Sequence, residues 1–164
     1  MKKARQLLTH IPERPPRPRN EGLTMVMDKG LSTREAEDLA AVGSDYIDYV
    51  KLGFGTSVIT PDVESKIRIY HDAGMTVYLG GTLFEAFVVR GLYDEYVSLL
   101  RESGIRMAEV SDGSYEFEHA DKLEYIRRLS QEFTVVSEVG SKKKNVVYSP
   151  DQWVGMMKSE LEAG

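Results

Sequence analysis

Apolar residues occur along this chain in five short runs, separated by longer segments in which apolar and polar positions alternate with helical spacing. The runs have strand length and are rich in β-branched, aromatic and aliphatic side chains: residues 23–27, 46–52, 76–79, 107–110 and 134–136. Helical periodicity is found over residues 32–42, 61–73, 93–102, 119–131 and 149–161. Capping residues support these helices, with Ser32 or Thr33 before the first and Pro150 at N1 of the last. Glycines fall where residues that terminate helices are expected: Gly43, Gly74 and Gly104.

Strands that alternate with helices at this spacing are predicted to lie parallel and to be joined by right-handed crossovers. A doubly wound sheet that binds a dinucleotide would carry G-x-G-x-x-G after its first strand, and the sequence there, TMVMDKGLS, lacks it. A barrel instead places reactive residues at the C-terminal ends of many successive strands. Such residues close or follow each run in turn: Asp28 and Lys29, Lys51, Thr82 and Glu85, Glu109 and Asp112, Glu138 and Lys142. The predicted fold is therefore α/β, of the (β/α)8 TIM-barrel type, with about five of the eight strand-helix units present.

The chain is predicted to have two parts. Residues 1–21 are basic and proline-rich, which opposes regular helix and central strand, so we expect an extended arm. Residues 22–164 are predicted to form the partial barrel domain. Eight strands close such a barrel, and about 250 residues are usual. We therefore expect that the chain is a fragment, that another chain supplies the missing units, or that an exposed sheet edge favours association into a homo-oligomer.

Charge and composition exclude several classes of function. A formal net charge of -5 and a pI near 5.3 leave no positive field for nucleic acid, and the lysine run at 142–144 is too short for a nucleic-acid tail. The chain has no cysteine, which excludes disulfides, thiolate metal sites and cysteine nucleophiles. Its longest apolar stretches have strand length, and its N-terminus lacks the apolar core of a signal peptide. We expect a cytoplasmic protein that binds neither nucleic acid nor membrane.

The second strand ends in a turn that is able to bind an anion. In VKLGFGTS, Gly53 and Gly55 allow close approach of the backbone, and Thr56 and Ser57 add hydroxyl groups. The same glycines could equally serve only the turn between strand and helix. Lys51, at the end of the strand, would be a cation inside the barrel, where it must be paired with a carboxylate or used to bind a ligand.

The third strand runs into a second such turn, YLGGTLFE. Gly81 and Thr82 fall at a predicted helix start, where main-chain N–H groups attract a carboxylate or phosphate. Glu85 favours a different interpretation, because a glutamate in a first helical turn commonly compensates the helix dipole or caps the helix.

Two glutamates, Glu109 and Glu138, lie inside or at the end of otherwise apolar strands. On adjacent strands they are spaced to share one magnesium ion with substrate oxygens. Alternatively, they pair with Lys51 and Lys142 and bind no metal. No zinc site is expected, because the histidines lie in the arm and in helical or loop segments: His10, His71 and His119.

The runs TMVMDKG, DYIDYVKLGFGTS, GGTLFE, AEVSDGS and VVSEVGSK, in this order, resemble the phosphosulfolactate synthase family over about residues 17–164. The resemblance implies a (β/α)8 barrel and a carbon-sulfur lyase. The family adds sulfite to phosphoenolpyruvate in a magnesium-dependent reaction, which yields (2R)-phospho-3-sulfolactate. This product leads to coenzyme M in methanogens and to sulfolactate in some spore-forming bacteria. The family's later motifs, with further acidic and arginine residues, have no counterpart in this sequence.

The resemblance also implies roles for individual residues. Lys142 would be the proton donor. Magnesium would be bound by Glu109, Glu138 and Asp28, and substrate by the following residues: Lys51, Lys29, Gly55, Thr56, Gly81 and Thr82. Phe54 stands where the family usually has tryptophan.

The residue types suit this chemistry. Sulfite attack on the enol phosphate moves negative charge onto the substrate carboxylate, which a divalent cation stabilises, and a partly desolvated lysine then donates a proton. Two other functions remain open. Plants have a heat-stress protein that resembles this family, so the chain could be a non-enzymatic member. It could also be a different barrel lyase that forms a Schiff base through Lys51 or Lys142.

Overall fold

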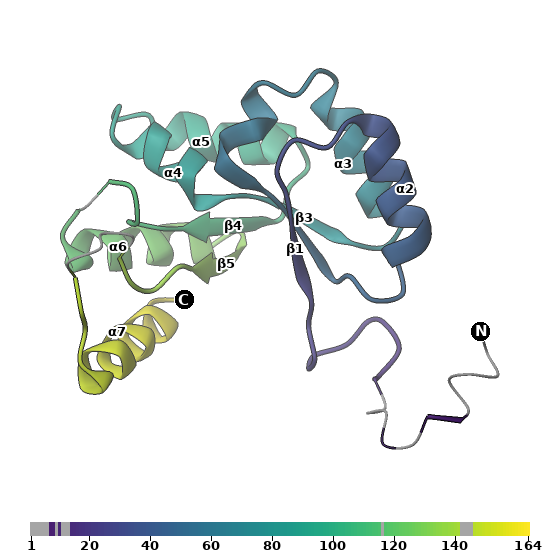
Figure 1. The fold of residues 1–164 in the computed structure, drawn as a ribbon. Coiled ribbons are helices and arrows are strands. Elements are labelled where there is room, and N and C mark those ends of the chain that lie inside the picture. The colour runs from purple at the N-terminus through teal and green to yellow at the C-terminus, as the bar shows by residue number, and fades with distance from the viewer. Residues whose placement is uncertain (1–6, 9, 11–13, 116, 142–145) are drawn as a thin grey trace.

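The computed structural model describes residues 7–8, 10, 14–115, 117–141 and 146–164. Its centre is one five-stranded parallel sheet with the strand order β1-β2-β3-β4-β5 (Figure 1). The strands are β1 (Met25–Asp28), β2 (Tyr49–Leu52), β3 (Thr76–Leu79), β4 (Met107–Val110) and β5 (Thr134–Ser137). This order is that of successive barrel units, as predicted, and the sheet is not closed, so β1 and β5 form its two edges.

A helix follows every strand of the sheet. The helical elements are α2 (Thr33–Gly43), the 3-10 helix η1 (Gly53–Val58), α3 (Val63–Asp72), α4 (Gly81–Val88), α5 (Tyr93–Glu102), α6 (His119–Ser130) and α7 (Pro150–Ala163). The predicted helices agree with these bounds to within two residues. None of the helices in the described part of the chain is both long and apolar enough to cross a membrane.

Strand alternation gives the sheet two different faces. Side chains such as Val50, Val77 and Ala108 are fully buried in the core between the sheet and the helices. Their strand neighbours Lys51 and Glu109 therefore point to the other face. The two faces continue across all five strands, because residues that are paired in the parallel register point to the same face of the sheet.

Two helices begin with a capping box. The Ser32 hydroxyl accepts from the Glu35 N–H while the Glu35 carboxylate accepts from the Ser32 N–H, and Ser149 forms the same arrangement with Gln152. At the helix C-termini, Gly74 and Gly104 have positive φ, as predicted.

The prediction for Gly43 was wrong. Gly43 is the last residue of α2 and not a residue beyond its end, and its φ is not positive. A Cβ atom at this position would lie 2.6 Å from Ile47 Cδ1. A glycine at this position lets the Ile47 side chain pack closely against the end of the helix.

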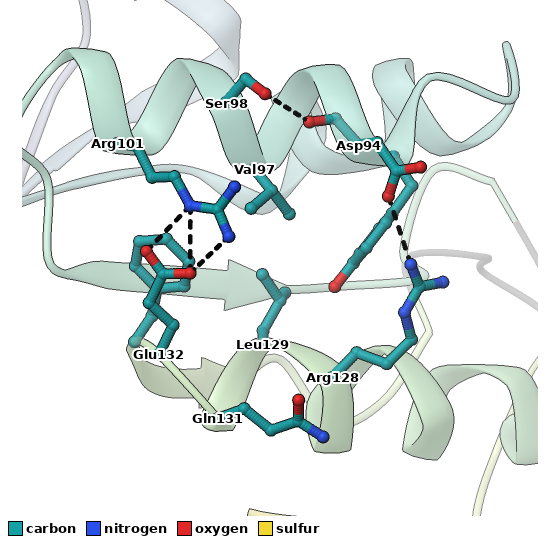
Figure 2. Close-up of a pocket in the computed structure, with 10 residues that line it drawn as sticks. Asp94, Val97, Ser98, Arg101, Arg128, Leu129, Gln131 and Glu132 are labelled. Carbon is teal, nitrogen blue, oxygen red and sulfur yellow. Dashed lines mark hydrogen bonds and ion pairs between the residues drawn. The ribbon is translucent and has the colours of Figure 1, made fainter.

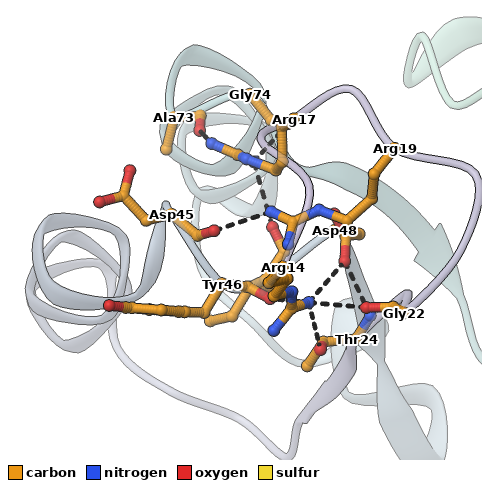
Figure 3. A network of polar contacts seen from close by, with 11 residues as sticks. Arg14, Arg17, Arg19, Gly22, Thr24, Asp45, Tyr46, Asp48, Ala73 and Gly74 are labelled. Carbon is orange, nitrogen blue, oxygen red and sulfur yellow. Dashed lines mark hydrogen bonds and ion pairs between the residues drawn. The ribbon is translucent and has the colours of Figure 1, made fainter. Parts of the chain in front are cut away.

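Residues 14–19 of the predicted arm lie against the domain through three arginines (Figure 3). Arg17 donates to the carbonyls of Ile47, Ala73 and Gly74, so it satisfies carbonyl groups at the end of α3. Arg14 and Arg19 both reach the Asp48 carboxylate, at 3.2 and 3.0 Å. These contacts attach residues 14–19 to the loops that precede β2 and β3. The boundary at residue 21 between arm and domain stays a prediction.

Candidate functional site

A cavity of about 480 Å³ opens on the face of the sheet opposite the helix-covered core. We call it the inner cavity. It is lined by residues from all five strand-helix units: Met25, Met27, Lys51, Phe54, Tyr78, Thr82, Glu109, Val136, Ser137 and Glu138. Three of the predicted charged residues, Lys51, Glu109 and Glu138, are thus brought to one place. Their meeting follows from the parallel register, which aligns the C-terminal ends of the strands.

Lys51 and Glu109 form an ion pair across β2 and β4, with Nζ 2.6 Å from Oε1. The carboxylate side chain is 4% exposed and the lysine side chain 14%. The second carboxylate oxygen of Glu109, Oε2, is buried and has no hydrogen-bond partner within the described ranges. A buried carboxylate with one free oxygen is costly, so this atom is available to a cation or a hydrogen-bond donor.

The glycine pair after β3 makes room for this ion pair. A Cβ atom on Gly80 would lie 3.0 Å from Lys51 Cε, and one on Gly81 would lie 3.0 Å from Glu109 Oε1. Gly80 is also the N-cap of α4 and provides no side-chain cap. The start of α4, with Gly81 and Thr82, is therefore adjacent to the paired charges, and Thr82 itself lines the inner cavity.

Tyr78 is a residue of this cavity that the sequence reasoning missed. It lies on the same face as Lys51, its partner in the register, and only 4% of it is exposed. Burial, together with the negative charges of Glu109 and Glu138, raises the pKa of Tyr78 well above its ordinary value of 10.0. Its hydroxyl therefore stays protonated and can donate a hydrogen bond. Aromatic residues are common in strands, so the sequence alone did not single out Tyr78. Its pairing with Lys51 in the sheet register does.

The inner cavity offers only a few protein ligands for magnesium. Within the described part of the chain, no group of three or more histidine, aspartate or glutamate residues is placed to hold a metal ion. Two carboxylates, Glu109 and Glu138, do line the cavity. Magnesium is commonly bound by one or two carboxylates, with water and substrate oxygens completing its coordination, so this pair with the free Glu109 oxygen suits it.

Asp28, the third predicted metal ligand, lies elsewhere. Its carboxylate is on the helix side of β1 and only 1% of the residue is exposed. It accepts from the main-chain N–H groups of Gly30 and Leu31, each at 2.8 Å, from the Tyr70 hydroxyl and from Lys66 Nζ, each at 2.9 Å. Burial alone would raise the pKa of Asp28, but these donors, Lys66 first, hold it below its ordinary value. The structure does not bring Asp28 together with the cavity carboxylates.

The remaining predicted substrate residues lie beside the cavity. Lys29 Nζ is 5.7 Å from the centre of the Phe54 ring, and Phe54 lines the cavity. Gly55 has φ 70°, the conformation for which glycine is suited, and the Thr56 hydroxyl donates to the Gly53 carbonyl. Lys142, the predicted proton donor, lies outside the described residues.

The first-turn interpretation of Glu85 was wrong. It is the fifth residue of α4, is 2% exposed, and does not cap its own helix. Its carboxylate accepts from the Ser111 hydroxyl and from three consecutive N–H groups in the loop after β4, those of residues 113–115. Glu85 thus holds the SDGS loop next to the site. Two of the sequence motifs, GGTLFE and AEVSDGS, are linked by this one side chain.

A second hollow, of about 320 Å³, lies on the outer surface between α5 and α6 (Figure 2). Its two arginines are both engaged. Arg101 binds Glu132 in a bidentate manner, with the closest atoms 2.6 Å apart, and Arg128 lies 3.9 Å from the Tyr93 ring centre and 3.3 Å from Asp94. None of the predicted site residues lines this hollow.

Comparison with known proteins gives a consistent result. The family model described as (2R)-phospho-3-sulfolactate synthase (ComA) matches residues 12–164. The phosphosulfolactate synthase of Bacillus subtilis is 36% identical over 156 residues, which cover 94% of this chain and 62% of the relative. The enzyme of that name from Methanocaldococcus jannaschii is 40% identical over 148 residues, covering 87% and 59%. The one from Methanothermobacter thermautotrophicus is 36% identical over 158 residues, covering 93% and 61%. The chain spans about three fifths of the length of these curated relatives.

Proposed function

The chain belongs to the phosphosulfolactate synthase family, and from this premise we propose that it acts in the magnesium-dependent addition of sulfite to phosphoenolpyruvate, giving (2R)-phospho-3-sulfolactate. The observation that supports this most directly is the inner cavity. There a lysine from β2 and two carboxylates, one from β4 and one at the end of β5, meet beside a helix N-terminus, as a trianionic substrate and its cation require.

In the proposed reaction, the sulfite sulfur attacks the methylene carbon of phosphoenolpyruvate and forms a carbon-sulfur bond. The electron pair of the double bond moves toward the substrate carboxylate, and a proton is then added at the neighbouring carbon. The phosphate ester is not broken. Magnesium, held by Glu109 and Glu138, would supply Lewis-acid stabilisation of the negative charge that develops.

The residues of the chain provide the remaining functions. Lys51 and the N–H groups of Gly81 and Thr82 bind anionic groups of the substrate. The protonated Tyr78 hydroxyl is a donor within the same cavity. Lys142 is assigned as the proton donor, because desolvation or a nearby cation lowers the pKa of a lysine and makes it a suitable general acid near neutral pH.

The decisive assay measures sulfite consumption in the presence of phosphoenolpyruvate, with and without magnesium, using the protein encoded by the complete gene. We expect loss of sulfite that stops when magnesium is chelated. A heat-stress protein without catalytic activity would consume none. Borohydride trapping with keto acids distinguishes the Schiff-base lyase, which we expect to give no adduct.

The acid role is tested with Lys142→Ala in the same protein. We expect turnover to fall by about 10²- to 10⁴-fold, the usual contribution of a general acid. Lys143→Ala, a neighbour of the same type, serves as the matched control and should retain activity. Near-normal turnover in Lys142→Ala would show that another group donates the proton.

Association with further copies and a cytoplasmic location remain part of this proposal. In the described part of the chain, β1 and β5 are the edge strands of the sheet, and strand edges of this kind support association because they favour pairing with another chain. Light scattering of the purified protein would measure the oligomeric state.

A further inference from the structure

Lys122, in α6, is a buried cation outside the inner cavity. Its side chain is 1% exposed. Its ammonium group lies 2.7 Å from the main-chain carbonyl of Glu138, 3.0 Å from Asp112 Oδ1 and 3.0 Å from Glu160 Oε1. These three partners come from the end of β5, from the loop after β4 and from α7. One side chain therefore joins three segments that are far apart in the sequence.

The contact with Glu138 bears on the inner cavity. The Glu138 N–H donates to the Val110 carbonyl at 3.0 Å, and the Glu138 carbonyl accepts from Lys122. The main chain on both sides of this residue is therefore held, which limits the directions its side chain can take. That side chain lines the inner cavity.

The segment after Glu138 is also held from α7. Gly140 has φ 119°, and a Cβ atom there would lie 2.5 Å from Cη2 of Trp153. The indole ring of α7 thus lies directly against the Gly140 backbone. Lys122 holds Glu160 of the same helix, so the two contacts act on one rigid unit.

A second buried lysine has the same arrangement at the other end of the sheet. Lys66, in α3, is 0% exposed and contacts the Asp28 carboxylate at 2.9 Å and the Leu31 carbonyl at 2.8 Å. It holds the loop after β1 but touches neither cavity glutamate. Well-packed apolar residues in place of a buried ion pair of this kind would stabilise the protein about equally. A role in fixing loop geometry therefore explains the two buried lysines better than a role in stability alone.

We propose that Lys122 is a positioning residue: it holds the Glu138 main chain so that the carboxylate faces Glu109 and the two can bind one divalent cation. The effect on cation binding rests on the proposed function, whereas the effect on the Glu138 main chain does not. Residues that orient metal ligands without touching the metal commonly change metal affinity by about 10- to 100-fold.

The test compares two side chains of equal length at position 122. The chain has no cysteine, so Lys122→Cys introduces a unique thiol that can be alkylated in the unfolded state. Reaction with 2-bromoethylamine restores an ammonium group, and reaction with 1-bromopropane gives a neutral side chain of the same length. Amide hydrogen exchange at Glu138 and binding of Mn²⁺, as a probe for magnesium, are measured on both proteins after refolding.

We expect the neutral side chain to speed exchange of the Glu138 amide by at least about 10-fold and to weaken Mn²⁺ binding by about 10- to 100-fold. The aminoethyl side chain should restore both. Lys66→Met is the control: it should speed exchange at Gly30 and Leu31, and the Glu138 amide should change only by the amount that the loss of global stability imposes on all slowly exchanging amides. If the propyl protein does not refold, Lys122→Met combined with Glu160→Gln removes the cation together with a buried counter-charge, and the same two measurements apply.

Each outcome decides the proposal. Equal Glu138 exchange in the propyl and aminoethyl proteins would overturn it. Faster exchange with unchanged Mn²⁺ affinity would overturn the role in cation binding. If the unaltered chain binds no Mn²⁺, the proposed metal site fails, and the exchange rates still show whether Lys122 holds Glu138.

Discussion

Buried carboxylates on the two faces of the sheet differ in how many hydrogen-bond donors they receive. On the helix side, Asp28 receives four donors, two from the main chain and one each from Tyr70 and Lys66. On the inner face, Glu109 has Lys51 on one oxygen, and its other oxygen has no hydrogen-bond partner in the described part of the chain. Both carboxylates are at most 4% exposed, so solvent does not explain the difference.

The comparison separates structural charges from those available for chemistry. A fully satisfied buried carboxylate fixes the groups around it, since moving any one of them leaves a buried charge without a partner. A carboxylate with a free oxygen gains by binding something else. The saturated carboxylates Asp28 and Glu85 therefore hold loops, whereas Glu109, which has a free oxygen, lies in the inner cavity.

Lys66→Met should give the largest loss of stability, because it leaves Asp28 buried beside an apolar chain. We expect the free energy of unfolding, measured by urea denaturation, to fall by about 3–5 kcal/mol. The double variant Asp28→Leu with Lys66→Met should recover most of this loss. A loss below about 1 kcal/mol in the single variant would mean that the cluster is not structurally important.

Glu85→Leu should have the next largest effect. It leaves the hydroxyl of Ser111 and the N–H groups of residues 113–115 without their acceptor, and we expect a loss of about 2–3 kcal/mol in the same assay. Glu95→Leu, on the exposed side of α5, is the matched control and should change stability by less than about 0.5 kcal/mol. Similar losses in the two variants would contradict the role assigned to Glu85.

Acid should weaken the helix-side cluster. The pKa of Asp28 lies below its ordinary 3.8 in the folded chain, so the unfolded chain binds this proton first as the pH falls. The contribution of Asp28 is therefore complete well above pH 3.8 and is lost as the pH falls through its folded value. Urea unfolding at several pH values should show this slope in the unaltered chain and a shallower one in Asp28→Asn.

Glu109→Gln should change stability least, by less than about 1 kcal/mol, because the Lys51 ammonium left behind is partly exposed and can be solvated. Mn²⁺ binding should fall by more than about 10-fold in the same variant. A small loss of stability together with a large loss of Mn²⁺ binding would distinguish the inner face from the helix side. A stability loss as large as that of Lys66→Met would remove the distinction.

Much of the architecture could be predicted because it depends on local patterns. The runs at 76–79 and 107–110 match β3 and β4 in both bounds, and the capping serine at 32 begins α2 as expected. The interior position of Lys51 was predicted, and its pairing with a carboxylate was one of the alternatives left open; the partner, Glu109, lies on β4, two strands away. Gly43 and Glu85 were misjudged, since their environments depend on Ile47 and on the loop after β4.

The parallel strand-helix order, the family and the set of charged residues at the strand ends could all be predicted from the sequence. Hydrophobic periodicity and capping act within a few residues, so they can be read along the chain. Only the tertiary structure decided which of those charges meet. It separated Asp28 from Glu109 by the alternation of the strands, placed Tyr78 beside the cavity, and buried Lys66 and Lys122 against partners from other units. Such pairings depend on sheet register and helix packing, which are fixed only when the whole domain is assembled.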